Sequence, residues 1–179
     1  MPGPVFIDGD DVTLRTATEE EVPFLRKHND DPRVRASRSV HEPADPDALR
    51  RRLGGTMGRD GNSLALLVCD VAEPVGLVYL IREKPNDVAF RHGELAYWIT
   101  PAEWGNGYAT AGAELLVGHA FDELGLHRVS ASAFADNDAS RRVLEKVGFE
   151  REGVARKEAF VDGEWQDVVN YGLLDEEWE

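Results

Sequence analysis

Two glycines, Gly105 and Gly107, stand one residue apart directly before a helical pattern, and Ala109 follows at the next alternate position. The start of a helix presents several unpaired backbone N–H groups and roughly half an elementary positive charge. Glycine lets that backbone come close to an anion, because no Cβ stands in the way. The spacing therefore favours a phosphate-binding loop, with a plain turn before a helix as the alternative.

Neither common phosphate-binding motif fits this loop. The dinucleotide pattern G-x-G-x-x-G fails because position 110 is Thr110, and the segment "GNGYAT" contains no Walker lysine. The backbone alone could hold a pyrophosphate, since local dipoles can bind an anion even on an acidic protein. The five histidines show no metal-ligand spacing, so no metal is expected.

The net charge limits which classes of partner and substrate the protein is expected to bind. The chain has 34 acidic and 20 basic residues and a formal net charge of -14. This charge disfavours nucleic acid, whose phosphates need Lys and Arg, and favours a cationic substrate such as an amine or a basic peptide. Adaptation to a salt-rich, halophile-like cytosol is the alternative, which the 16 Arg against 4 Lys also fit. In that case the charge says nothing about the substrate.

The remaining global features predict a single cytoplasmic domain over residues 1–179. The sequence shows no apolar run long enough to cross a bilayer and no signal peptide, so no membrane association is expected. The one cysteine, Cys69, lies in the apolar run "LALLVC" and is interpreted as a core residue. The oligomeric state stays open between a monomer and a homodimer.

The elements that position the loop follow from periodicity and turn signals. The predicted order is strand, two helices, three strands, helix, strand, helix and two strands. These elements are expected at residues 12–16, 18–28, 45–53, 63–71, 74–83, 92–100, 113–124, 127–134, 137–147 and 154–174, the last range being a hairpin around Asp162-Gly163. Polar, glycine-rich loops such as residues 54–63 connect them.

Two of these helices have a clear apolar stripe. The stripe of the helix after the glycines is Ala113, Leu116, Val117, Ala120, Phe121 and Leu124. The shorter helix is expected to turn Ala139, Val143, Leu144 and Val147 inward, with Gly148 closing it. A strand–helix–strand unit in the middle of the chain implies one parallel pair. The predicted class is α+β (mixed α/β), a central twisted sheet that is mostly antiparallel, with helices on its faces.

Two blocks of this pattern resemble the GNAT superfamily of acetyl-CoA-dependent N-acetyltransferases. They are Trp104–Ala109 ("WGNGYA") and Asn137–Phe149 ("NDASRRVLEKVGF"), and they look like the RimJ/RimL-type branch, named for enzymes that acetylate N-terminal amines of ribosomal proteins. The family loop is written [RQ]-x-x-G-x-[GA]. Trp104 replaces the usual Arg or Gln, which costs one side-chain donor and leaves the backbone cradle. The resemblance covers about Val12 to Leu173 and implies the GNAT fold.

The resemblance implies an acetyl-CoA site made largely of backbone. The exposed backbone of Trp98, Ile99 and Thr100 would pair with the pantetheine arm, which enters a splay between the strands at 92–100 and 127–134. Asn137 would contact the cofactor, and Arg142 would reach its phosphates unless it only faces solvent. The pyrophosphate would rest on the backbone N–H groups of Gly105, Asn106, Gly107, Tyr108, Ala109 and Thr110.

The chemistry of acyl transfer to an amine adds further requirements. The attacking amine must be neutral, and a protein N-terminus has a pKa of about 7.7–8.0 against about 10.4 for lysine, so lysine needs a base far more. Glu94, a carboxylate in an otherwise apolar strand, is the candidate base through a water molecule; an outward-facing or salt-bridged Glu is the alternative. Ser140, by resemblance to RimL-type enzymes, is the candidate donor to the departing thiolate, with helix capping as the alternative. A backbone N–H of Ile99–Thr100 would stabilise the oxyanion.

The sequence thus predicts an enzyme that moves the acetyl group of acetyl-CoA to a primary amine by direct attack, with a protein N-terminal α-amine as one acceptor. The alternatives are a polyamine or aminoglycoside N-acetyltransferase and a non-catalytic acyl-CoA-binding sensor. The acceptor itself is not readable, because the segments expected to contact it, residues 35–45 and 161–165, contain no decodable chemistry.

Overall fold

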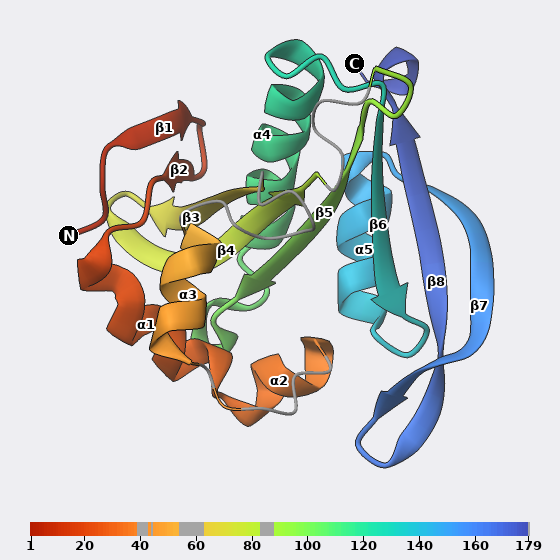
Figure 1. The fold of residues 1–179 in the computed structure, drawn as a ribbon, viewed down its shortest axis with the longest axis horizontal. Helices are drawn as coiled ribbons and strands as arrows, with labels where there is room; N and C mark the ends of the chain where they lie inside the picture. Colours follow the sequence, from red (N-terminus) through yellow and green to blue (C-terminus); the bar gives the residue numbers. More distant parts are fainter. Residues whose placement is uncertain (39–42, 44, 54–62, 83–87, 179) are drawn as a thin grey trace.

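The computed structural model describes residues 1–38, 43, 45–53, 63–82 and 88–178. Within these residues, eight strands form one twisted sheet in the order β1-β2-β3-β4-β5-β6-β8-β7 (Figure 1). The strands are β1 (Val5–Asp8), β2 (Thr13–Arg15), β3 (Leu64–Asp70), β4 (Glu73–Ile81), β5 (His92–Ile99), β6 (Arg128–Phe134), β7 (Glu150–Val161) and β8 (Glu164–Leu174). Among these described strands, β5 and β6 pair in parallel and the other neighbours are antiparallel.

Helices cover both faces of the sheet. The long helices on one face are α4 (Tyr108–Asp122) and α5 (Asp138–Val147), and on the other are α1 (Val22–Asn29), α2 (Pro32–Arg38) and α3 (Pro46–Leu53). The apolar stripe of α4 packs with Leu95 and Ile99 of β5. On the opposite face, Leu25 of α1 packs with Trp98, which points the other way from the same strand. The predicted fold class is therefore confirmed.

The turn chemistry read from the sequence is also confirmed. Asp162 and Gly163 have φ values of +49° and +85°, which is the pattern of a two-residue hairpin turn with both central residues left-handed. Gly148 ends α5 at φ +108°. Gly163 and Gly148 both have a backbone conformation that glycine adopts without steric cost.

Three predictions about the elements were wrong. In the described part of the N-terminal region there are two strands and three α-helices, and of these β1 and α2 were not predicted. β1 has four mostly exposed residues and gave no periodic signal. α2 did leave a signal, since Asp31 precedes Pro32 and the Asp31 carboxylate accepts the Arg33 N–H at 2.9 Å. Ala139 was expected inside, but it lies on the exposed side of α5.

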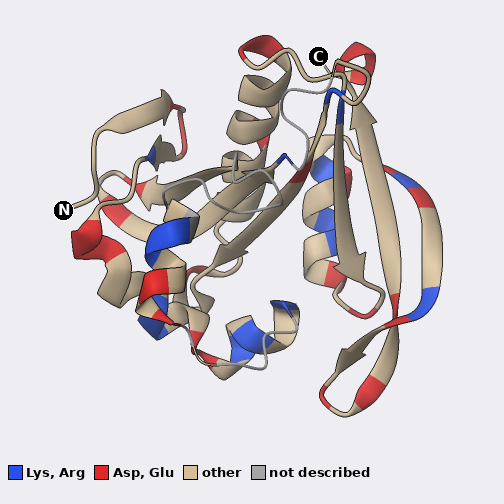
Figure 2. Cartoon of the chain, in the orientation of Figure 1, with Lys and Arg blue, Asp and Glu red and all other residues tan. Residues whose placement is uncertain are grey.

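Two predicted segments cannot be compared with the fold. The glycine-rich loop at 54–63 lies outside the described residues except for Ser63, and the expected acceptor segment 35–45 is described only at 35–38, 43 and 45. Charged residues are distributed over most elements, with Lys and Arg prominent on α2, α3 and α5 (Figure 2).

Candidate functional site

The glycines before α4 adopt a backbone conformation that other residues avoid. Gly105 has φ +87°, and Gly107, the N-cap of α4, has φ +85°. A Cβ added to either glycine would meet no atom of the described chain within 4 Å. The glycines are therefore needed for the turn of the backbone and not to avoid crowding. The space beside both residues leaves room for a ligand at the start of the helix.

The first turn of α4 offers a set of backbone donors. The helix is 15 residues long, its N-cap makes no side-chain hydrogen bond, and its first turn contains no acidic residue. The N–H groups of Tyr108, Ala109 and Thr110 precede the first intrahelical donor, Ala111, which bonds the Gly107 carbonyl at 3.0 Å. Unpaired N–H groups and the helix dipole together favour an anion at this position.

Side chains fix the loop against the end of β5. The Trp104 indole donates to the Ile99 carbonyl oxygen at 2.8 Å, although the side chain is 52% exposed. The Asn106 amide donates to the Glu103 carboxylate at 2.9 Å. Trp104 therefore ties the loop to the sheet, and Asn106 has its backbone N–H left to offer an anion.

The parallel strands β5 and β6 separate after a short paired stretch. The pairing between them covers His92–Glu94 and Arg128–Ser130. Beyond Glu94 and Ser130, β5 and β6 do not pair with each other in the described sheet. The remainder of β5 keeps its pairing with β4 up to Ile99. One edge of β5 is thus left without a strand partner, which is the splay that the sequence led us to expect.

Only some backbone groups of β5 face the splay. The Thr100 N–H donates to the Val75 carbonyl at 2.8 Å, so this residue directs its backbone toward β4. Alternate residues of an antiparallel strand direct their backbone to opposite neighbours. Trp98 consequently also faces β4, and Tyr97 and Ile99 face the splay. Of the three predicted cofactor-contacting residues, Ile99 has its N–H in the required direction.

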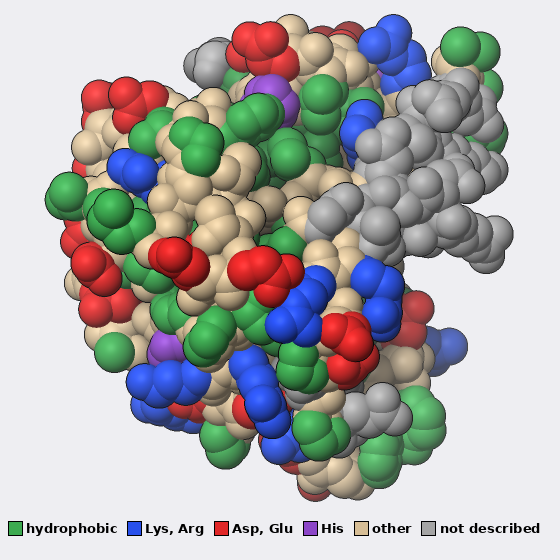
Figure 3. Space-filling view, turned by 60° about the vertical axis from the view of Figure 1, so that its left-hand side comes forward, with side chains coloured by type: hydrophobic (Ala, Val, Ile, Leu, Met, Phe, Trp, Pro, Cys, Tyr) green, Lys and Arg blue, Asp and Glu red, His purple; other side chains and the backbone are tan. Residues whose placement is uncertain are grey.

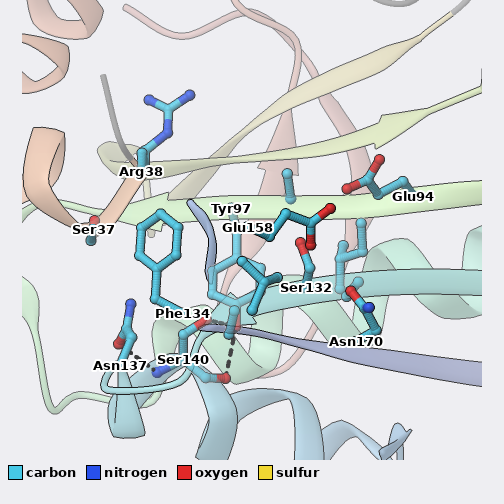
Figure 4. Close-up of a pocket in the computed structure, with 15 residues that line it drawn as sticks. Ser37, Arg38, Glu94, Tyr97, Ser132, Phe134, Asn137, Ser140, Glu158 and Asn170 are labelled. Carbon is cyan, nitrogen blue, oxygen red and sulfur yellow. Dashed lines mark hydrogen bonds between the residues drawn. The ribbon is translucent and has the colours of Figure 1, made fainter. Parts of the chain in front are cut away.

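A cavity of about 480 Å³ opens where the strands part (Figure 4). Its walls come from α2, β5, β6, α5, β7 and β8 and include three of the predicted residues. The lining residues are Ser37, Arg38, Glu94, Leu95, Ala96, Tyr97, Ala131, Ser132, Ala133, Phe134, Asn137, Ser140, Glu158, Val168 and Asn170. The structure thus brings together Glu94, Asn137 and Ser140 from distant parts of the sequence.

Ser140 belongs to a small hydrogen-bonded group in this cavity. The Tyr97 hydroxyl lies 2.9 Å from Ser140 Oγ and 3.1 Å from the Ser140 carbonyl oxygen, to which it can donate. The Ser140 N–H donates to the Asn137 side chain at 3.1 Å, which makes Asn137 the N-cap of α5. Burial raises the pKa of Tyr97 to about 12, so the phenol keeps its proton at neutral pH.

Residues 11–150 match the model of the acetyltransferase (GNAT) domain. This range covers 140 of the 179 residues and contains the glycine loop, the splay and Ser140. The chain belongs to the GNAT acetyltransferase family. The predicted family is thereby confirmed.

Known members of the GNAT family match the chain over different lengths. A Bacillus subtilis protein named as a ribosomal N-acetyltransferase, YdaF, is 43% identical over 93 residues, which is 52% of this chain and 51% of YdaF. The spermidine N(1)-acetyltransferase of Escherichia coli K12 is 28% identical over 110 residues, 62% of this chain and 57% of that protein. The chain spans about half the length of the first curated relatives it matches.

A solved structure matches nearly the whole chain. Mycobacterium smegmatis RimJ, solved in complex with CoA-disulfide, is 25% identical and superposes with a TM-score of 0.77. The match covers 98% of this chain and 88% of RimJ. The mixed sheet with its splayed pair is therefore the GNAT fold.

The other predicted residues of this GNAT domain lie outside the cavity lining. Arg142 is exposed on α5, and the loop residues 105–110 stand at the start of α4. Cys69 is buried, and burial raises the pKa of its thiol to about 11, which makes it a poor nucleophile. Acidic and basic side chains are interspersed on the face shown in Figure 3.

The described residues contain neither a metal-ligand cluster nor a membrane-spanning helix. In that part of the chain, no three His, Cys, Asp or Glu residues come together as metal ligands would. No helix there combines the length and apolarity needed to span a bilayer.

Several cavity residues were missed from the sequence. Tyr97 was interpreted as a packing residue of its strand, Glu158 and Asn170 were not singled out, and Arg38 was included only as part of the expected acceptor segment 35–45. Arg38 lies on the helix α2 that was not predicted. Glu158 and Asn170 lie on β7 and β8, and no local spacing relates them to Ser140. Only their convergence in the folded sheet identifies them.

Proposed function

We propose that this GNAT domain transfers the acetyl group of acetyl-CoA to a primary amine by direct attack. The observation that supports it best is the continuity of one segment. The open edge of β5 runs into the glycine loop, which Trp104 ties to Ile99, and the loop ends at the uncapped first turn of α4. A long ligand with an anionic centre fits such a path.

The residues present fit acetyl-CoA on structural grounds. Open space adjoins Gly105 and Gly107, and the unpaired N–H groups of Tyr108, Ala109 and Thr110 can donate hydrogen bonds to a pyrophosphate there. Outward backbone groups on β5 can hold an amide-containing arm as an added strand would be held. Acetyl-CoA supplies the activated acetyl thioester. The chain must then position the amine, polarise the acyl oxygen and provide a hydrogen bond to the leaving sulfur.

Ser140 and Tyr97 can provide that last hydrogen bond together. The phenol has one hydrogen, so while it donates to the Ser140 carbonyl it can accept from the Ser140 hydroxyl. If the phenol turns its hydrogen to Ser140 Oγ, the serine hydrogen is released toward the cavity. In this proposal Ser140 donates to negative charge on sulfur, and Tyr97 compensates for the change.

Glu94 and the β5 backbone complete the proposed roles. Glu94 is exposed at the cavity wall, where its carboxylate can take a proton from the amine through a water molecule. The Ile99 N–H faces the splay and is the better oxyanion donor of the predicted Ile99–Thr100 pair, since Thr100 already donates to Val75.

The acceptor we favour is a peptide or protein α-amine, and a polyamine is the second candidate. The similarity to YdaF, which is named a ribosomal N-acetyltransferase, supports the first, and the similarity to spermidine N(1)-acetyltransferase supports the second. An α-amine is substantially neutral near pH 8, so an exposed base such as Glu94 meets its requirement more easily than that of a polyamine. A cytoplasmic location, the homodimer and a salt-adapted surface stay predictions.

The test is a thiol-release assay with acetyl-CoA and a panel of amines: peptides with a free α-amine, peptides with a single lysine amine, spermidine and an aminoglycoside. We expect the highest kcat/KM for the α-amine peptides. A preference for spermidine would favour the second candidate. Tight CoA binding by calorimetry with no thiol release from any amine would instead indicate a non-catalytic sensor.

A further inference from the structure

Strand β7 contains an irregularity beside the cavity. Ala155 pairs with Val168 of β8, and Ala159 pairs with Gln166. Three residues of β7 therefore stand opposite the single residue Asp167. The middle one, Lys157, has φ +54°, a left-handed conformation that is uncommon and unfavourable for a lysine.

The bulge changes the direction of Glu158. On β8, Val168 lines the cavity, while Val169 packs in the core beneath α4 and α5. Ala159 shares the face of its partner Gln166, which is the face of Val168. Simple alternation would place Glu158 on the opposite face of the sheet. Instead Glu158 lines the cavity, together with residues of β5, β6 and α5 (Figure 4).

Asp167 holds the bulge in place. Its carboxylate accepts the Lys157 N–H at 2.9 Å, in place of a ladder hydrogen bond that the bulge removes. The Lys157 ammonium donates to the Trp165 carbonyl oxygen at 3.1 Å and lies 3.9 Å from Asp167. The hydrogen bond from the Lys157 backbone N–H to Asp167 therefore fixes the chain directly before Glu158.

Glu158 itself makes no hydrogen bond or ion pair with any residue in the described part of the chain. Its carboxylate is thus available to a ligand. A carboxylate at the wall of a cavity whose acceptor is an amine attracts the protonated form of that amine and raises its local concentration.

We infer that the β7 bulge is a device for acceptor recognition: Asp167 positions Glu158, and Glu158 binds the ammonium form of the acceptor before its deprotonation. This inference rests on the proposed amine acceptor and extends it, because it assigns selectivity for cationic amines to one carboxylate and one positioning residue. Lys157 contributes through its backbone N–H, so its side chain is dispensable for recognition.

Steady-state kinetics on the full chain tests the assignment, with acetyl-CoA and two acceptors. One is an α-amine peptide, which is largely cationic at pH 7, and the other is an aromatic amine, which is neutral there. Glu158→Gln should raise KM for the peptide roughly fivefold, as expected for an exposed ion pair. It should leave KM for the aromatic amine and for acetyl-CoA unchanged. Glu164→Gln, an exposed carboxylate at the tip of the same hairpin, is the matched control and should change neither.

The positioning role of Asp167 has its own variants. Asp167→Ala should reproduce the peptide KM increase of Glu158→Gln. Asp167→Asn should have a peptide KM close to that of the wild type, because the amide oxygen still accepts the Lys157 N–H. Lys157→Gly keeps that N–H and suits φ +54°, so it should behave as the wild type. Unchanged peptide KM in a folded Asp167→Ala would overturn the positioning role, and equal KM changes for both acceptors in Glu158→Gln would overturn ammonium recognition.

Calorimetry separates this inference from the proposed function. Spermidine is titrated into CoA-loaded wild type and into CoA-loaded Glu158→Gln. Roughly fivefold weaker binding by the variant supports the inference even if the wild type releases no thiol from acetyl-CoA, in which case only the proposed function fails. Equal binding by both proteins overturns the inference whatever the turnover.

Discussion

The proposed cofactor side of the site is one continuous segment, residues 97–110, and it offers mainly backbone groups. The opposite side is built from side chains of α2, β5, β6, α5, β7 and β8, which are far apart in sequence. A backbone site depends on the path of the chain, which two glycines and one helix start largely determine. A side-chain site depends on where distant strands finally pair. The first is therefore recognisable from a local motif, and the second is not.

Ser140→Ala should have the largest effect on turnover, because it removes the proposed hydrogen-bond donor to the leaving sulfur. Loss of the donor to the thiolate should lower kcat about 100-fold while KM for acetyl-CoA changes little, because general acid assistance acts in the transition state. Ser130→Ala is the control, since that hydroxyl contacts the Gly93 carbonyl on the paired part of the strands, outside the cavity lining. An unchanged kcat in Ser140→Ala would remove Ser140 from the mechanism.

Gly107→Val should weaken the binding of acetyl-CoA by the backbone of the loop. The side chain strains a residue at φ +85° and occupies the space beside the helix start, so KM for acetyl-CoA should rise at least about tenfold, the value of one lost charge-assisted hydrogen bond. Gly163→Val is a matched control for strain, with the same φ of +85° and equally open surroundings on the hairpin. If both variants have the wild-type KM for acetyl-CoA, the loop does not hold the cofactor.

Tyr97→Phe should have an intermediate effect on kcat. The hydrogen bond to Ser140 is lost without a change in ring packing, so a decrease of about three- to tenfold is expected, with KM for both substrates retained. A decrease as large as that of Ser140→Ala would instead indicate that Tyr97 is itself the donor.

The same variant carries a pH signature. Burial raises the folded-state pKa of Tyr97 from 10.0 to about 12, so its contribution to stability is complete below pH 10 and is lost as the pH rises toward 12. Denaturant unfolding should show the wild type losing about 2 kcal/mol more than Tyr97→Phe over this range. Parallel losses in the two proteins would contradict the burial of a protonated phenol.

Glu94→Gln should have the smallest effect. At high pH the acceptor amine is already neutral, so turnover should match that of the wild type. At low pH the amine needs a base, and turnover should fall a few-fold below that of the wild type. The pH profile of kcat/KM measures this, and a pH-independent ratio of the two proteins would exclude Glu94 as the base.

The sequence predicted the fold where each signal was local. The hairpin at Asp162-Gly163, the buried stripe of α4 and the ending of α5 at Gly148 each depend on residues of one short segment of the chain. β1 was not predicted because this short, mostly exposed strand has no hydrophobic periodicity. The inward orientation predicted for Ala139 was wrong because a small apolar residue near the start of a helix can lie on either face.

The candidate site divides in the same way. The loop and Ser140 lie in motifs with fixed spacing, so the sequence singles them out as candidates, and their roles stay predictions. The direction of the Thr100 N–H depends on the register of β5 against β4. The orientation of Glu158 depends on a bulge that only the pairing of β7 with β8 reveals. Neither property leaves a pattern in the sequence.

The most direct test of the account is a coupled measurement of both products of the reaction. Thiol release from acetyl-CoA is followed in the presence of an α-amine peptide, and the acetylated peptide is quantified by mass spectrometry. We predict equal amounts of free thiol and singly acetylated peptide, with the acetyl group on the α-amine and the signal strongly reduced in Ser140→Ala. Thiol release at the level of background hydrolysis across the whole amine panel, from a protein that binds CoA, would contradict it.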